Sequence, residues 1–283
     1  MAVVIGLLVA IAFGSGDFLG ARASQRATTA GVLLVAQISA LAGAVLVATL
    51  ISADVTGRDL AFGAIAGSAN VLGLGLLYHG LAHGQMSTVA PVTAVVGAIV
   101  PVSWGLIEGE RPSALVLVGV GCALVAGALL AREEDGGGPK VGGRSQVLVA
   151  VAAGAALGTS FIMFAKTSSG SGYWPVLSAR LAAVVLVGLV VLVLVLARPG
   201  SVTFPAGRDR ALALGAGGLD VLATTLLVIA VRRELAVVVA PVASLAPGMT
   251  VVLAWRVLHE RIGRSQLVGL GVAGLGLVLI ASG

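Results

Sequence analysis

Long apolar stretches alternate with short polar connections along the whole chain. Segments such as "LAAVVLVGLVVLVLVLA" (181–197) have no polar residues at helical or alternating spacing, so they lack the polar face of a surface element in a soluble domain. About 20 apolar residues suffice to cross a bilayer as a helix. The pattern predicts ten such spans, at residues 2–21, 30–52, 60–82, 86–107, 113–131, 146–165, 174–197, 209–230, 235–257 and 266–282.

The spans are predicted to be helices. In lipid every backbone polar group needs a partner, and barrel strands would alternate apolar and polar residues, which these runs do not. The first stretch, "MAVVIGLLVAIAFGSG", lacks the basic residues that begin a signal peptide, so it is taken as the first span. The predicted fold class is therefore an all-α integral membrane protein with ten transmembrane helices.

Composition agrees with this class. Of 283 residues, 58% are hydrophobic and 10% charged, whereas soluble domains carry about 25% charged residues. The net charge of +5 is expected to act on membrane orientation and anionic lipid headgroups, and no nucleic-acid partner is expected. The single cysteine, Cys122, lies in mid-span and cannot form an intrachain disulfide.

The chain contains an internal repeat. A charged, Gly-rich stretch, "REEDGGGPKVGGRS" at 132–145, separates five spans (1–131) from five spans (146–283). A shift of 150 residues aligns "VAPVASLAPGMTVVLAWRVLHER" (239–261) with "VAPVTAVVGAIVPVSWGLIEGER" (89–111). Because each half has an odd number of spans, the second half would enter the membrane upside down, which predicts two inverted five-helix repeats.

These motifs resemble the drug/metabolite transporter superfamily, specifically its EamA-type members. Each half has a Gly-containing first helix, a "VAPV" entry to the fourth helix and a Glu-Arg pair before a Gly-rich fifth helix. The resemblance implies ten helices around a central cavity, with the fifth helix of each half at the periphery. It also implies transport of small metabolites, often export, without fixing a substrate. The family's second-helix arginine is matched by Arg180, whereas the first half has Gln37 there.

Ionisable residues inside a span cost a few kcal/mol, so each needs a structural or functional reason. Asp220 lies near mid-membrane, Arg180 near the start of the seventh span and Asp17 near the end of the first. Each is either a structural group or part of a substrate or proton site. The candidate substrate-binding or coupling residues are Asp220, Arg180, Asp17, Asn70, Gln37, Ser15, Thr159, Ser160 and His79, and the candidate gating or kink residues are Pro91, Pro101, Pro241 and Pro247.

Two roles are open for Asp220. If Arg180 pairs with it, Asp220 stays ionised and orients the arginine toward an anionic group on the substrate. If the two do not pair, Asp220 is free to take up and release a proton. By the 144-residue shift Asp17 corresponds to Phe161, so the two copies differ where a cavity is expected.

The predicted function is a secondary transporter that moves a small amino-acid-like or drug-like metabolite by alternating access. Export is expected, with or without proton coupling, and the protein is expected to be a monomer or weak homodimer. The alternative is an uncoupled facilitator or channel for small solutes. No nucleotide-binding loop, nucleophile motif or metal-spaced His/Cys cluster is found in the sequence, so no enzyme activity, metal or cofactor is expected.

The expected location is the cell membrane, multi-pass in the inner membrane. Eleven Lys and Arg residues follow odd-numbered spans and five follow even-numbered spans, which by the positive-inside rule puts both termini outside. The family resemblance instead implies termini inside.

Overall fold

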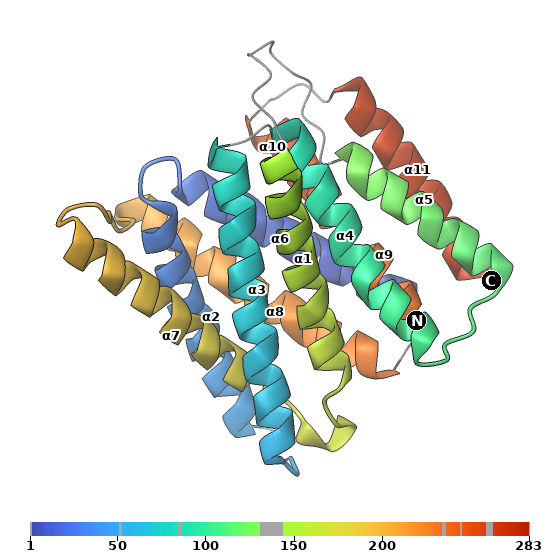
Figure 1. The fold of residues 1–283 in the computed structure, drawn as a ribbon, viewed down its shortest axis with the longest axis horizontal. Coiled ribbons are helices and arrows are strands. Elements are labelled where there is room, and N and C mark those ends of the chain that lie inside the picture. Colours follow the sequence, from blue (N-terminus) through green and yellow to red (C-terminus); the bar gives the residue numbers. More distant parts are fainter. Residues whose placement is uncertain are drawn as a thin grey trace.

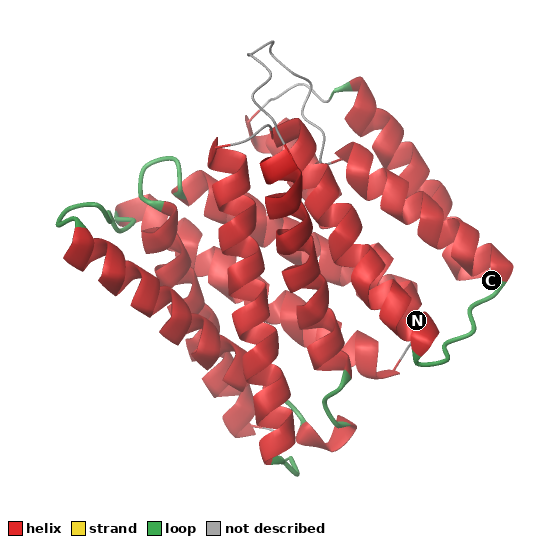
Figure 2. Ribbon diagram, viewed as in Figure 1, coloured by secondary structure: helices red, strands yellow, loops and turns green. Residues whose placement is uncertain are grey.

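Every regular element in the described part of the chain is helical (Figure 2). The computed structural model describes residues 2–50, 53–83, 86–130, 144–233, 236–243, 245–258 and 263–282. The helices, labelled in Figure 1 where there is room, are α1 (Ala2–Ala23), α2 (Thr29–Leu50), α3 (Gly57–His83), α4 (Met86–Ile107), α5 (Ala114–Leu130), α6 (Arg144–Ala165), η1 (Ser169–Ser171), α7 (Trp174–Ala197), α8 (Gly207–Arg233), α9 (Ala236–Ala243), α10 (Ala246–Leu258) and α11 (Arg264–Ser282).

Nine predicted spans each coincide with one helix, to within three residues at either end. The predicted span at 235–257 is occupied by two helices, α9 and α10, instead of one continuous helix. Pro247 has no N–H with which to bond the carbonyl of Ala243, so the helical ladder is interrupted there. Leu245 and Gly248 instead make bonds of the tighter i to i+3 kind, to Val242 and Leu245.

The helix lengths fit a membrane. In the described residues, α1, α2, α3, α6, α7 and α8 are each long and apolar enough to cross a bilayer, and α4, α5, α10 and α11 contain shorter apolar stretches. Large apolar side chains such as Leu196 and Val193 are exposed, at 73% and 63%. An outer surface of this kind fits contact with lipid, and the protein is a multi-pass membrane protein.

The helices pack in a definite pattern. Helix α1 lies against α8 and α3 lies against α6, while α7 contacts both α2 and α3. Helix α2 also packs on α8, and α4 packs on α6. Helices α5 and α11 lie side by side at the edge of the bundle (Figure 1).

Two glycines allow the inner helices to approach closely. A Cβ on Gly67 of α3 would lie 2.0 Å from the carbonyl oxygen of Ala179 on α7. A Cβ on Gly217 of α8 would lie 2.0 Å from the carbonyl oxygen of Ala36 on α2. These contacts position Ala179 and Ala36, and with them the residues that follow each in the sequence, Arg180 and Gln37.

The bundle has two ends, which we name by the termini. The chain termini lie near each other at one end, here called the termini end (Figure 1). Helix α1 starts there and finishes at the opposite end, called the far end, where α2 begins. At the far end, Thr28 and Thr203 of the α1–α2 and α7–α8 connections bond each other through backbone and hydroxyl groups.

At the termini end, Asp59 joins α3 to the α6–α7 connection. The carboxylate accepts bonds from the Ser168 N–H at 2.7 Å and its hydroxyl at 3.0 Å. Asp59 also forms a reciprocal cap with Thr56: the Thr56 N–H and hydroxyl donate to the carboxylate, and the Asp59 N–H donates to the Thr56 hydroxyl. We call this group, Thr56, Asp59 and Ser168, the Asp59 clasp.

Candidate functional site

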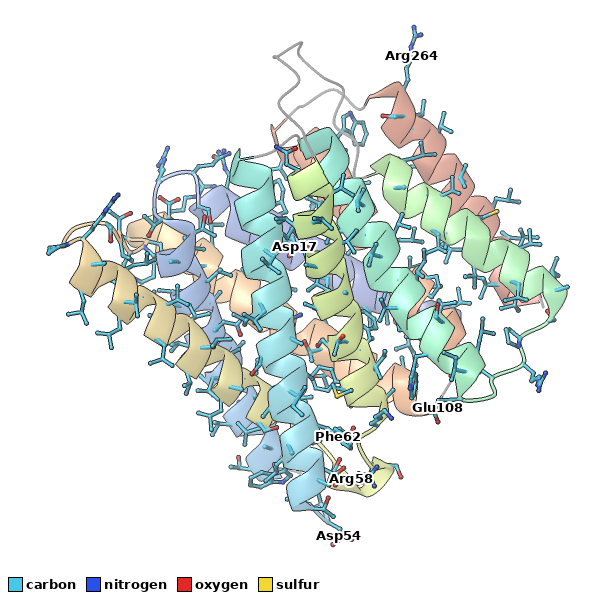
Figure 3. The ribbon with its side chains drawn as sticks, in the orientation of Figure 1. Asp17, Asp54, Arg58, Phe62, Glu108 and Arg264 are labelled. Atoms are coloured by element: carbon cyan, nitrogen blue, oxygen red, sulfur yellow. The ribbon has the colours of Figure 1, made fainter. Side chains whose placement is uncertain are left out.

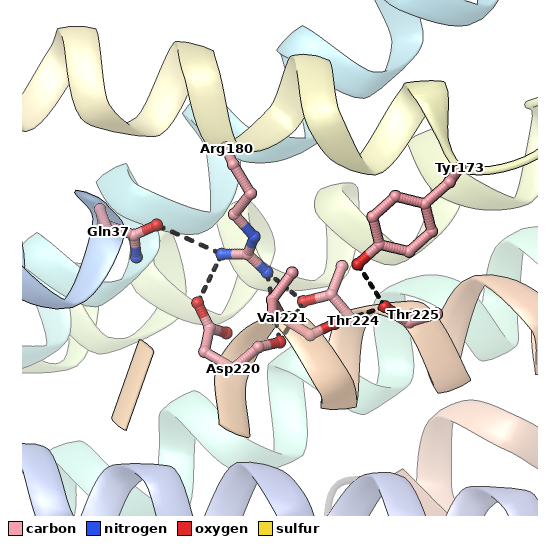
Figure 4. Close-up of polar contacts among 7 residues, drawn as sticks. All are labelled: Gln37, Tyr173, Arg180, Asp220, Val221, Thr224 and Thr225. Carbon is pink, nitrogen blue, oxygen red and sulfur yellow. Dashed lines mark hydrogen bonds and ion pairs between the residues drawn. The ribbon is translucent and has the colours of Figure 1, made fainter. Parts of the chain in front are cut away.

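Arg180 is the centre of a buried polar group contributed by three helices (Figure 4). It lies on α7 and is only 4% exposed. Its Nη1 donates to Asp220 Oδ2 on α8 at 2.5 Å and to Gln37 Oε1 on α2 at 3.3 Å. Its Nη2 donates to the hydroxyl of Thr224 and to the backbone carbonyl of Asp220. A buried guanidinium therefore has an ion-pair partner and neutral acceptors around it.

The local sequence of α8 explains this arrangement. Asp220 and Thr224 are four residues apart, so they lie on one face of the helix, toward α7. The Thr224 hydroxyl also donates back to the Asp220 carbonyl at 2.8 Å, which fixes its orientation. Of the two alternatives for Asp220, the structure has the one in which Arg180 pairs with it. The side chain of Asp220 remains 22% exposed.

A cavity of about 60 Å³ lies between the helices on the far-end side of this pair. Ser24 and Thr29 lie at its far-end margin, and Gln37 and Asp220 lie at its depth. On this measure, one water molecule needs about 10–15 Å³, so the cavity has room for about four to six water molecules or for one compact solute in their place. The residues that line it are Phe13, Gly16, Asp17, Gly20, Ser24, Thr29, Val32, Leu33, Ala36, Gln37, Leu74, Ala216 and Asp220.

Asp17 of α1 lines this cavity and is exposed. No hydrogen bond or ion pair to its carboxylate is found within the described residues. Asp17 and Asp220 thus line one cavity, but only Asp220 has a cation beside it. The sequence predicted both acids as candidates, and the structure brings them to the same cavity with Gln37.

Toward the termini end, the helices are closed by apolar packing. On the termini-end side of the ion pair, the Tyr173 hydroxyl and the Thr225 hydroxyl form a hydrogen bond of 2.5 Å. Phe164, Val228 and Val239 are at most 3% exposed in the same cluster, and Phe161 packs against it. The Asp59 clasp lies beyond this cluster. We call the cluster with these side chains the termini-end plug.

The other predicted residues lie outside the cavity lining. Asn70 of α3 has a buried Oδ1 for which no hydrogen-bond partner is found in the described part. The hydroxyl of Thr159 donates to the Ala155 carbonyl of its own helix, Ser160 is 3% exposed, and Ser15 is half-buried.

The candidate gating prolines lie in different structural contexts. Helix α4 continues through buried Pro101, whereas Pro241 lies inside the short α9. The side chains of His79, Pro91 and Pro247 lie outside the described residues. The proposed gating role of these prolines stays a prediction.

Sequence reasoning missed several residues of the site. Thr224 could have been found, because it follows Asp220 by one helical turn. Tyr173 and Phe13 carry no comparable signal, since an aromatic residue in an apolar helix more often packs in a core. Gly20 and Ala36 make room for the cavity, and their small size is common in all these helices.

No cofactor site is evident in the described part of the chain, where no three His, Cys, Asp or Glu residues are grouped so as to hold a metal ion.

These features define the class of protein, a multi-pass helical membrane protein with a charged site between its helices. Residues 144–282, the second half of the described bundle, match the EamA-like transporter family, in the drug/metabolite transporter superfamily. A solved structure titled "Crystal structure of protein" is 16% identical with a TM-score of 0.73, covering 99% of this chain and 97% of that one. This likeness concerns the fold alone. A search of curated proteins found no match to the chain.

Proposed function

We propose that the protein is a secondary transporter that moves a small solute across the membrane by alternating access. The observation that carries this proposal is the asymmetry of the cavity. It reaches from the far end to Gln37 and Asp220, while the termini-end plug and the Asp59 clasp close the path beyond them. A carrier caught in one of its two access states has this arrangement.

The helix contacts support two inverted halves. If α1, α2, α3 and α5 of the first half correspond to α6, α7, α8 and α11 of the second, α1 on α8 corresponds to α6 on α3, and both contacts exist. Likewise α2 on α8 corresponds to α7 on α3, and the helix pairs α2–α7 and α5–α11 each map onto themselves. Gly67 and Gly217, 150 residues apart, meet Ala179 and Ala36 in the same way.

Alternating access then requires an exchange of contacts between the ends. Opening the termini end would release the Asp59–Ser168 bonds and separate the plug. The far end would close around the Thr28–Thr203 contact, which already joins the two halves there. The buried Arg180–Asp220 pair lies between these ends, where it serves as a fixed element of the site.

We further propose that Asp17 is the acid that couples transport to protons. Because Arg180 already holds Asp220, the role of a proton carrier falls to the acid without a cation beside it. Asp17 is also in reach of solvent from the far end. Proton exchange for a solute would support export from the cell, and the inner membrane is the proposed location.

Transport can be tested with purified protein in liposomes loaded with unlabelled solute. A carrier gives transient, saturable accumulation of labelled solute against its own gradient, whereas a facilitator that acts as a channel equilibrates without saturation. The test of proton coupling uses Asp17→Asn. Exchange should persist at solute concentrations that saturate the variant, but a pH gradient should no longer drive accumulation. Unsaturable flux would favour the alternative of a channel, and pH-driven accumulation by Asp17→Asn would remove Asp17 from coupling.

A further inference from the structure

We propose that the cavity takes a small organic cation, an ammonium group on a compact apolar body, and that Asp17 recognises its charge. This inference rests on the proposed transport function and names the class of solute that the same cavity would accept. It departs from the expectation that Arg180 would face an anionic group on the substrate.

Arg180 does not offer its terminal nitrogens to an anion in this structure, and its Nε, for which no hydrogen-bond partner is found among the described residues, is buried. Both terminal nitrogens already donate, to Asp220, Gln37 and Thr224, and the side chain is 4% exposed. The residue is not among those that line the cavity. To bind a carboxylate or phosphate, it would have to exchange the Asp220 partner for the ligand inside a poorly solvated site, which leaves Asp220 unpaired.

The charge that the cavity presents is therefore negative. Asp17 and Asp220 are the charged groups among the described residues of its lining, where no Lys, Arg or His occurs. Arg180 compensates Asp220 but not Asp17. Since charges interact more strongly where water is restricted, a cation beside Asp17 is favoured and an anion beside it is repelled.

The other residues that line the cavity indicate the chemistry of the uncharged part of the ligand. Phe13, Val32, Leu33 and Leu74 give the same cavity apolar walls, and an aromatic ring such as that of Phe13 attracts an ammonium group that approaches its face. Ser24 and Thr29 supply hydroxyl groups toward the far end. This combination suits a cation with apolar substituents better than a strongly hydrated inorganic ion, which would need more oxygen ligands.

Comparison of the two repeats indicates whether helix packing requires an acid at position 17. A shift of 144 residues places Phe161 at the position of Asp17 and Phe164 at the position of Gly20. Both phenylalanines contribute to the termini-end plug, whereas Asp17 and Gly20 line the open cavity. The fold thus accommodates an aromatic residue at the equivalent position, so an acid is not required there for helix packing.

The test uses three solutes of nearly the same shape and different charge: choline, 3,3-dimethylbutan-1-ol and 3,3-dimethylbutanoate. Binding to the purified full chain is measured by isothermal titration calorimetry at one pH and ionic strength. Choline should bind at least about tenfold more tightly than either analogue. Equal affinity for the three solutes, or preference for the carboxylate, would overturn the proposal, and this comparison needs no variant.

Two variants identify the residue responsible. Asp17→Asn keeps the shape of the side chain and should remove about a factor of ten of choline affinity while leaving that of the alcohol unchanged. Asp54→Asn is the control, because it removes the same charge from an exposed connection at the periphery of the bundle (Figure 3). Undiminished preference for choline in folded Asp17→Asn would contradict the assignment.

Liposome flux distinguishes this inference from the proposed function. Saturable flux of the carboxylate without flux of choline would leave a transporter but refute the cation. Binding of choline without flux of any of the three solutes would retain the cation site but refute transport of this class.

Discussion

Among single residues, Asp220 is expected to be important for stability, because its carboxylate compensates the buried guanidinium of Arg180. We expect Asp220→Asn to lower the free energy of unfolding by about 3 kcal/mol, since Arg180 would remain buried with only neutral acceptors. In an Arg180→Met background there is no buried charge to compensate, so the same substitution should cost much less. Thermal unfolding in detergent of the wild type, both single variants and the double variant measures this coupling.

Equal effects of Asp220→Asn in the two backgrounds would show that the pair contributes no coupling energy. A destabilised Asp220→Asn protein would also lose transport for a structural reason. Transport by this variant should therefore be compared with that of the double variant, which restores the charge balance.

The sequence predicted the charged residues of the site but not their relations. Asp220, Arg180 and Asp17 were found because an ionisable group in an apolar span is costly and so has a role. Their pairing could not be predicted, because the faces of α7 and α8 are set by tertiary contacts such as Gly67 on Ala179. The open position of Asp17 likewise depends on Gly16, Gly20 and Ala36, whose small size has no distinctive pattern.

At the scale of helices, Gly217 and Gly218 form a matched pair of neighbours. A Cβ at Gly217 would meet the carbonyl oxygen of Ala36, which cannot move without moving α2, whereas a Cβ at Gly218 meets nothing within 4 Å. We expect Gly217→Ala to destabilise the protein by about 2 kcal/mol. Gly218→Ala should be neutral or stabilising by up to about 1 kcal/mol, because alanine favours a helix.

Thermal unfolding of both variants provides the measurement. Solute affinity gives a second one, since displacement of α2 would move Gln37 away from Arg180. Equal melting temperatures for the two variants would mean that the α2–α8 contact tolerates a methyl group, contrary to the geometry.

The Asp59 clasp is expected to hold the termini end closed. Asp59→Asn leaves one acceptor oxygen in place of two, so the bonds from Thr56 and Ser168 cannot all persist. Hydrogen bonds to a charged group contribute about 1.5–3 kcal/mol, so the open state should become about tenfold more populated or more. A cysteine at Val228, 3% exposed within the plug, reports this opening in a Cys122→Ala background.

The measurement is the rate of labelling by a membrane-impermeant maleimide, with Asp54→Asn as the charge-matched control. An unchanged rate in Asp59→Asn would show that the clasp merely caps α3. Thr56→Ala separates the two roles further, since it removes the cap hydroxyl but leaves the Ser168 bonds.

Helix positions were predictable because each span is both long and apolar. The interruption between α9 and α10 was not predictable, although the prolines in this region were recognised. Helix α4 contains Pro101 and continues, so a proline alone does not decide whether a helix breaks. The outcome depends on whether neighbouring groups satisfy the freed carbonyl. Sequence patterns do not show those neighbours.

At the scale of the whole molecule, the cavity and the chain termini belong to opposite sides of the membrane. Ser24 lies at the far-end margin of the cavity, whereas both termini lie at the other end of the bundle. A cysteine at Ser24, in the Cys122→Ala background, should therefore react with an impermeant maleimide from the side opposite to a reporter fused at Gly283. This relation holds whichever way the protein is inserted.

The same experiment decides between the two predicted orientations. Loop charges favour termini outside, which directs the cavity of this state to the cytoplasm, whereas the family resemblance implies termini inside and a cavity facing outward. Intact cells with a compartment-sensitive reporter at Gly283 and the Ser24→Cys label measure both sides at once. Labelling from the same side as the reporter would mean that the termini and the cavity mouth share a face, and would refute the proposed access route.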